Sequence, residues 1–226
     1  MSPQKKILLG ILTVLLAIAT VVAVMMVSKP APPPAITGVL IPAAKPLQKF
    51  SLLDHNNRSF TRQDLLGQWH IISYGYTYCP DICPMTLTTL AEVARRIRQD
   101  QAFTDVRFLF YTIDPGRDTP ARLAEYVPWF HKGFVGLTRV DAAGASDLGF
   151  EQSLGILSVI TPLEMDRGLE DFGGYSVSHG VTIYLLNPDG DLQAVFKPTV
   201  DRDGTQYFTV DQIYQDYRKI RNYVGQ

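Results

Sequence analysis

Two cysteines, four residues apart, are the residues of this sequence best suited to chemistry. Cys79 and Cys83 are the only cysteines among 226 residues, and residues 76–84 read Tyr-Thr-Tyr-Cys-Pro-Asp-Ile-Cys-Pro. This spacing brings both sulfurs to one side of a loop. Two thiols so placed can form a reversible disulfide bond, exchange with other disulfides or bind a soft metal ion.

The position of the pair favours a redox or metal-binding role over a structural one. Pro84 reads as the first residue of a helix, so Cys83 lies near its N-cap, where free N–H groups and the helix dipole lower a thiol pKa. We therefore expect Cys83 to be the more acidic thiol. A structural disulfide would close a very short loop and stabilise the fold by only about 2 kcal/mol. A buried core pair does not suit a loop flanked by prolines.

Strands and helices alternate around this loop. A small hairpin is expected over residues 50–61. A helix is expected to begin at Pro120 after the N-cap Thr119 and to run towards Phe130, with a kink or break at Pro128. A turn at residues 187–190 makes the last strand antiparallel to its predecessor. The expected strands are 69–76, 106–113, 134–140, 181–186 and 192–196, and the expected helices are 85–98, 120–130, 143–154 and 210–223.

This order predicts an α/β protein with a thioredoxin-like fold, a central mixed sheet flanked by helices. Its last part, a strand, a glycine turn, an antiparallel strand and a helix, is typical of that fold. Residues 156–178 interrupt the pattern and are expected to form a surface excursion.

One of the four histidines is a candidate third ligand. His55 is expected in a solvated turn, His70 in a buried strand, and His131 at a helix end, where it would act as a cationic cap. His179 precedes the strand at 181–186, and in a thioredoxin-like fold that position abuts the cysteine loop. The sequence therefore predicts a site made of Cys79, Cys83 and His179.

This donor set suits copper. Soft thiolates favour copper(I), and the added imidazole allows copper(II) as well. Structural zinc would want four protein ligands, and the only further candidate, Asp81, is awkwardly placed. We expect one copper ion per chain.

The N-terminal segment predicts a membrane anchor. Residues 7–27 carry no charge over 21 positions, long enough to cross a bilayer, and Lys5 and Lys6 before them place residues 1–6 in the cytoplasm. The alternative is a signal peptide cleaved after Ala17-Ile18-Ala19, but the apolar run continues past that point. Residues 28–46 are rich in proline and predict a linker, which leaves 47–226 as the copper-binding domain on the outer, periplasmic or equivalent, face.

The charge distribution disfavours nucleic-acid binding. The net charge is −1, divided into +4 over residues 1–46 and −5 over the remainder. No run of lysine and arginine interleaves with aromatic residues, so the composition gives no sign of a nucleic-acid surface.

These motifs resemble the Sco/SenC copper chaperones of cytochrome c oxidase assembly. The resemblance covers nearly the whole chain and rests on the cysteine loop, on residues 113–120 (Ile-Asp-Pro-Gly-Arg-Asp-Thr-Pro), on residues 134–138 (Phe-Val-Gly-Leu-Thr) and on His179. It implies copper held by Cys79, Cys83 and His179 and delivered to the dinuclear copper centre of the oxidase. The partners would be the copper-containing subunit of the oxidase, with other copper chaperones or thioredoxin-like reductases as further candidates.

Two other functions remain open from the sequence. A thiol–disulfide reductase could use Cys79 and Cys83 as its catalytic pair to keep the copper-ligand cysteines of the oxidase reduced, although thioredoxin-type enzymes have two intervening residues, not three. A copper or redox sensor could act through contacts with a partner. His179 favours metal binding, because dithiol exchange needs no imidazole there.

Overall fold

The computed structural model describes residues 2–27, 32–140, 148–162 and 175–225. The chain divides into two units, Met1–Pro33 and Pro34–Gln226. The first unit contains helix α1 (Pro3–Val27), a run of leucine, isoleucine, alanine and valine whose Pro3–Ala23 segment is long and apolar enough to cross a membrane. A signal sequence at the N-terminus has the same properties.

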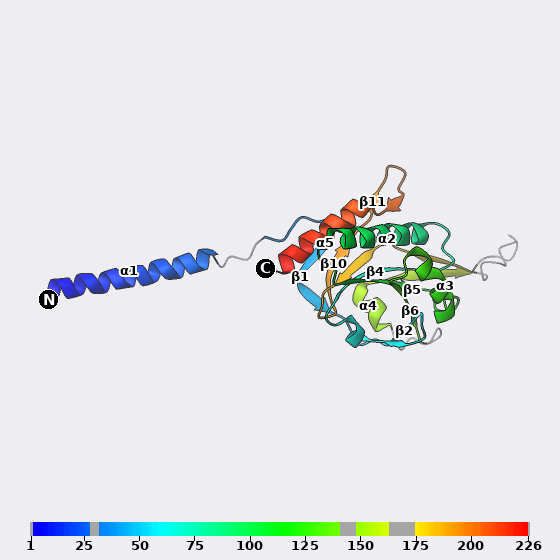
Figure 1. The fold of residues 1–226 in the computed structure, drawn as a ribbon, viewed down its shortest axis with the longest axis horizontal. Helices are drawn as coiled ribbons and strands as arrows, with labels where there is room; N and C mark the ends of the chain where they lie inside the picture. The colour runs from blue at the N-terminus through cyan, green and yellow to red at the C-terminus, as the bar shows by residue number, and fades with distance from the viewer. Residues whose placement is uncertain (1, 28–31, 141–147, 163–174, 226) are drawn as a thin grey trace. The chain divides into compact units, whose positions relative to one another are not determined.

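The second unit is built on an eight-stranded mixed sheet, shown in Figure 1. Its strand order is β1-β10-β9-β4-β5-β6-β2-β3, in which β4, β5 and β6 are parallel and the remaining neighbours are antiparallel. The central strands β4 and β5 are mostly apolar, with few polar residues, as expected for strands covered on both faces. The bounds are β1 Gly38–Pro46, β2 Leu52–Asp54, β3 Ser59–Phe60, β4 Trp69–Gly75, β5 Val106–Thr112, β6 Phe134–Arg139, β9 Ile183–Leu186 and β10 Asp191–Phe196.

Helices cover both faces of this sheet, so the predicted arrangement of a mixed sheet flanked by helices is confirmed. Helices α2 (Ile82–Asp100), α3 (Pro120–Phe130) and α5 (Val210–Val224) enclose one core, with α2 and α5 side by side in Figure 1. The short helix α4 (Gly149–Leu154) and a 3₁₀ turn (Arg62–Leu65) pack on the other core. Two small hairpins, β7 (Ser158–Pro162) with β8 (Tyr175–His179) and β11 (Thr199–Val200) with β12 (Gln206–Tyr207), lie outside the main sheet.

Three expectations about the ends of elements need correction. The segment expected as linker contains β1, which pairs with β10. Helix α2 begins at Ile82 with Asp81 as its N-cap, two residues before the expected start at Pro84. Helix α3 has the predicted N-cap Thr119 and runs to Phe130 as expected, but it is not broken at Pro128, because a proline in the last turn removes only one backbone hydrogen bond.

Two further segments differ in extent from their predictions. The helix expected over residues 143–154 is described only as α4, and residues 141–147 lie outside the described residues. The expected excursion at 156–178 supplies β7 and most of β8, which pair in register from Ser158 opposite His179 to Pro162 opposite Tyr175. Residues 163–174 lie outside the described residues.

Candidate metal centre

The cysteine loop joins the end of β4 to the start of α2. Both cysteines are free thiols, and both are buried, with Cys79 8% and Cys83 3% exposed. The expectation that a proline-flanked loop would leave them exposed is therefore wrong. Cys83 packs directly on the backbone of Gly75, where an added Cβ would lie 2.5 Å from its sulfur. Glycine at this position makes room for the Cys83 side chain.

The structure brings His179 to this loop. His179 ends β8, and its Nε2 lies 3.9 Å from the sulfur of Cys83. Its Nδ1 lies 2.7 Å from the carbonyl oxygen of Gly180. Because a carbonyl oxygen only accepts, Nδ1 donates its proton there, and the lone pair of Nε2 in the neutral ring faces the sulfur. This is the tautomer that a metal-binding histidine needs.

The distance between Cys83 and His179 can be compared with that of two ligands of one metal ion. With bonds of about 2.3 Å to sulfur and about 2.0 Å to nitrogen, two ligands at 120° around one metal lie about 3.7 Å apart. The 3.9 Å between Cys83 and His179 is close to this value. No group of three histidine, cysteine or acidic side chains in the described part of the chain is already arranged to hold a metal ion. Metal binding at Cys79, Cys83 and His179 would therefore require their side chains to rearrange.

The two thiols differ strongly in acidity. The pKa of Cys79 is lowered to about 4, mainly by a hydrogen bond from the Cys83 thiol, with further contributions from the N–H groups of Asp81 and Cys83, while burial opposes them. The pKa of Cys83 is raised, first by this hydrogen bond to Cys79 and then by burial. The expected order is thus reversed. Because α2 begins at Ile82, the free N–H groups at its start lie where they can donate hydrogen bonds to Cys79.

A buried carboxylate supports the first half of the cysteine loop. Asp118 is fully buried and accepts hydrogen bonds from the Thr77 N–H (2.8 Å), the Thr77 hydroxyl (2.6 Å) and the Thr112 hydroxyl (2.6 Å). Burial raises the pKa of Asp118, and these hydrogen bonds oppose the rise. Asp118 was recognised in the sequence only as part of the family motif, and its role in holding Thr77 was not predicted.

Aromatic rings surround the imidazole. The ring of Tyr74 lies 5.4 Å from that of His179, and the ring of Tyr76 lies 5.9 Å from it in an edge-on arrangement. Tyr74 also stacks on Tyr184 from β9. These rings restrict the orientation of His179 from the side of β4 and from the cysteine loop.

The other histidines have separate structural environments. His55 accepts a hydrogen bond from the Gly136 N–H at 2.9 Å and so connects two segments. The prediction of a free, solvated side chain is therefore wrong. His131 accepts from the Gly133 N–H at 3.0 Å, and burial, followed by Arg98, lowers its pKa. The cationic capping role expected for His131 is therefore wrong. His70 is buried in β4 as predicted.

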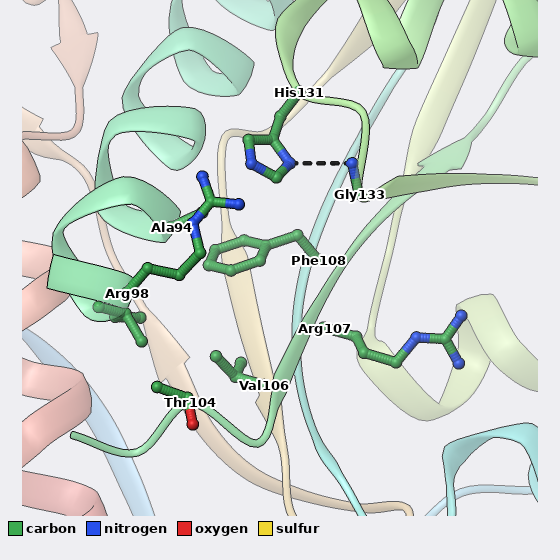
Figure 2. A pocket seen from close by; sticks show the side chains of 9 residues that line it. Ala94, Arg98, Thr104, Val106, Arg107, Phe108, His131 and Gly133 are labelled. Carbon is green, nitrogen blue, oxygen red and sulfur yellow. Dashed lines mark hydrogen bonds between the residues drawn. The ribbon is translucent and has the colours of Figure 1, made fainter. Parts of the chain in front are cut away.

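A hollow elsewhere on the molecule is unrelated to the cysteines. It has a volume of about 170 Å³ and lies at the start of β5, whereas the cysteine loop follows the other end of the parallel neighbour β4. Figure 2 shows Arg98 and Phe108 at this hollow and the hydrogen bond between His131 and Gly133. Its lining includes neither a cysteine nor a carboxylate.

Comparison with known proteins gives consistent matches. A protein of Stutzerimonas stutzeri, named as copper-binding, is 36% identical over 170 residues, which cover 74% of this chain and 77% of that protein. The mitochondrial SCO2 homologue of Bos taurus is 38% identical over 141 residues, covering 62% of this chain and 50% of the relative. The chain spans about half the length of such mitochondrial relatives.

Solved structures show the same fold. The crystal structure of Arabidopsis thaliana ScoI with copper bound has a TM-score of 0.64 and 28% identity, covering 78% of this chain and 99% of that one. Yeast Sco1 with copper bound has a TM-score of 0.61 and 28% identity, covering 80% and 90%. The thioredoxin-like fold class predicted from the sequence is confirmed. The family model described as SCO1/SenC matches residues 41–213, and the chain therefore belongs to the SCO1/SenC family.

Proposed function

We propose that this protein binds one copper ion through Cys79, Cys83 and His179 and delivers it to the dinuclear copper centre of cytochrome c oxidase. The observation that carries the proposal is the 3.9 Å approach of the His179 Nε2 to the sulfur of Cys83, which lies in the first turn of α2, directly after the loop that holds Cys79. The hydrogen bond from Nδ1 to Gly180 leaves Nε2 free to act as a ligand.

The chemistry of the donors favours copper. Copper stands highest in affinity among the divalent first-row metals, and thiolates favour copper(I). A structural zinc site would be closed by four protein ligands, and this site offers three. Burial of both thiols also protects the bound metal from competing ligands in water. These properties suit an ion that is carried as cargo.

The related proteins support cytochrome c oxidase as the partner. Proteins named SCO1 and SCO2 homologues share 31–40% identity with this chain, and the solved relatives at 28% identity include two with copper bound. The resemblance to this family supports the oxidase subunit that holds two copper ions as the receiving partner. We further propose that α1 anchors the chain, with residues 1–6 in the cytoplasm and the copper-binding unit on the outer face, because Lys5 and Lys6 precede the apolar run.

Copper stoichiometry and X-ray absorption on the full-length chain in detergent test the proposal. The reduced wild type should bind about one copper ion with two sulfur neighbours and, for copper(II), one imidazole nitrogen. C79S/C83S should bind none at this site, and H179A should lose the nitrogen neighbour. H131A is the matched control, because His131 lies away from the cysteines, and it should bind like the wild type. A wild type without sulfur neighbours would refute the site.

The thiol–disulfide reductase is a second candidate, favoured by one observation. A Cys79 thiol with a pKa lowered to about 4 beside a Cys83 thiol with a raised pKa is the asymmetry of an attacking and a resolving thiol. H179A separates the two functions. If oxidase assembly at limiting copper survives H179A but not either cysteine substitution, the reductase explains the protein better. If all three substitutions abolish assembly and added copper rescues only H179A, delivery of copper is the function.

A further inference from the structure

The two parts of the candidate site come from elements that are not paired in one sheet. The cysteines follow β4 in the main sheet, whereas His179 ends β8, which pairs only with β7 among the described strands. The candidate ligands Cys83 and His179 are 96 residues apart in the sequence. The position of His179 therefore depends on what fixes β8 against the rest of the molecule.

Tyr175, at the other end of β8, is joined to the loop that follows β5. Its hydroxyl donates a hydrogen bond to Oδ1 of Asp114 at 2.5 Å. Its carbonyl oxygen accepts from Nη1 of Arg117 at 3.1 Å, and the same guanidinium lies 3.9 Å from the centre of its ring. Backbone, hydroxyl and ring of one residue are thus all engaged by Asp114 and Arg117.

Asp114 and Arg117 are themselves firmly placed. They form an ion pair with each other, and their side chains are only 2% and 11% exposed. The carbonyl of Asp114 accepts from the N–H groups of Arg117 and Asp118, and the Asp114 N–H donates to the hydroxyl of Thr112 at the end of β5. An ion pair with so little solvent is weakly screened, so it resists rearrangement.

Arg117 also reaches the cysteine loop. Its guanidinium lies 5.1 Å from the centre of the Tyr78 ring and 5.7 Å from that of Tyr76, and these residues precede Cys79. Cation–π contacts of this kind are attractive within about 6 Å. Arg117 therefore touches both segments that carry the candidate ligands.

The contacts of Tyr175 with Asp114 and Arg117 can affect the imidazole of His179 through β8. Side chains alternate along a strand, so Tyr175, Val177 and His179 lie on the same face of β8. Val177 is buried in the core, Tyr175 is bound by Asp114 and Arg117, and His179 faces Cys83. With Val177 as a fixed middle point, release of Tyr175 would let the strand tilt and move His179.

We propose that Asp114, Arg117 and Tyr175 form a clamp that holds β8 against the cysteine loop and thereby positions His179 as a copper ligand. Tyr175 is a positioning residue in this arrangement, because it acts through β8 and does not touch the metal. The inference rests on the proposed function for its consequence in copper binding. The clamp itself is a property of the metal-free chain and can be tested separately.

The first experiment measures copper in full-length Y175F, which keeps the ring over Arg117 and loses the bond to Asp114. Copper(II) affinity should fall by roughly 10- to 100-fold, the usual loss when a group that orients a ligand is removed. The copper(II) electron paramagnetic resonance spectrum should shift towards that of H179A, and copper(I) affinity should change little. Y207F is the control, since Tyr207 is a half-buried tyrosine in the other small hairpin; it should behave like the wild type.

A double substitution distinguishes positioning from general loss of structure. If the clamp acts through His179, Y175F should have no further effect on copper(II) affinity in an H179A background. An equal fall in both backgrounds would overturn the inference, because the effect would not pass through the imidazole. Unchanged copper(II) affinity and spectrum in Y175F would overturn it as well.

The second experiment uses the metal-free chain and is independent of the proposed function. Hydrogen exchange of the backbone amides of β8 should accelerate in Y175F, while the amides of β4 and β5 exchange as in the wild type. Uniform acceleration in all three strands, or none in β8, would refute the clamp. If the wild type binds no copper, the proposed function fails, and this measurement alone decides whether the clamp exists.

Discussion

Replacement of Gly75 by alanine is a sharp test of how Cys83 is placed. The new Cβ would lie 2.5 Å from the Cys83 sulfur and 3.4 Å from both the Cys83 Cβ and the Phe110 ring. A contact of ordinary length requires the sulfur to retreat by about 1 Å, and a closely packed interior offers little room for that. The sulfur would then leave the position from which it faces Nε2 of His179.

The expected result is a combined loss of stability and copper binding. Overpacking of a core by one methyl group costs about 1–3 kcal/mol. The free energy of unfolding of G75A, measured by urea denaturation of the reduced, metal-free protein, should fall within that range. Copper affinity should fall by at least tenfold, because one of three donors is displaced.

A matched alanine substitution separates this overlap from the mere addition of a methyl group. At Gly180, next to His179, an added Cβ would meet only the Tyr74 hydroxyl at 3.4 Å, an ordinary contact. G180A should therefore retain copper affinity and stability. If G75A bound copper as tightly as the wild type and G180A, the packing of Cys83 against Gly75 would have no bearing on the site.

Three further predictions address the titrating and buried groups. The pKa of His70 is lowered to about 4, chiefly by burial and then by Arg107. Because His70 of the unfolded chain binds a proton already near pH 6.5, the free energy of unfolding should fall by about 3 kcal/mol as the pH drops from 6.5 to 4. Urea denaturation should show a smaller fall for H70F than for the wild type. Brief treatment of the reduced, metal-free protein with iodoacetamide at pH 6, followed by peptide mass spectrometry, should label Cys79 before Cys83; preferential labelling of Cys83 would contradict the acidity order. D118N should lower the free energy of unfolding by about 1–3 kcal/mol, since the buried hydrogen bonds from Thr77 lose their charged acceptor, and equal stability of D118N and wild type in urea would contradict this.

The central part of the fold could be predicted because its signals are local. The strand at 106–113 is a nearly continuous apolar run, and the N-cap Thr119 followed by Pro120 indicates the start of a helix. β1 was missed because its prolines suggested a linker. It is, however, an edge strand, and Pro42 lies where the pairing with β10 shifts register between Leu40 and Lys45, so a missing N–H is tolerated there.

The acidity of the thiols was predicted in the wrong order mainly because the hydrogen bond from the Cys83 thiol to Cys79 could not be predicted from the sequence. The start of α2, two residues earlier than expected, adds backbone N–H groups that favour the Cys79 thiolate. Proline is accepted anywhere in the first turn of a helix, where N–H groups have no partner within the helix, and Pro84 is the third residue of α2, not the first. Asp114, Arg117 and Tyr175 could not be associated from the sequence. Tyr175 is 58 residues from Arg117, and nothing in either local pattern indicates their contact.

Copper delivery and disulfide reduction use the same two sulfur atoms, so one molecule cannot perform both at the same time. A disulfide between Cys79 and Cys83 removes both thiolate donors, and a bound copper ion prevents the thiols from attacking a partner. The acidity of Cys79 serves both functions, since a thiolate is the nucleophile as well as the metal ligand. The imidazole of His179 is different. Its Nδ1 is engaged by Gly180 and its Nε2 faces Cys83, an arrangement that a metal ligand requires and dithiol exchange does not. It is therefore the histidine, more than the cysteine pair, that favours copper binding.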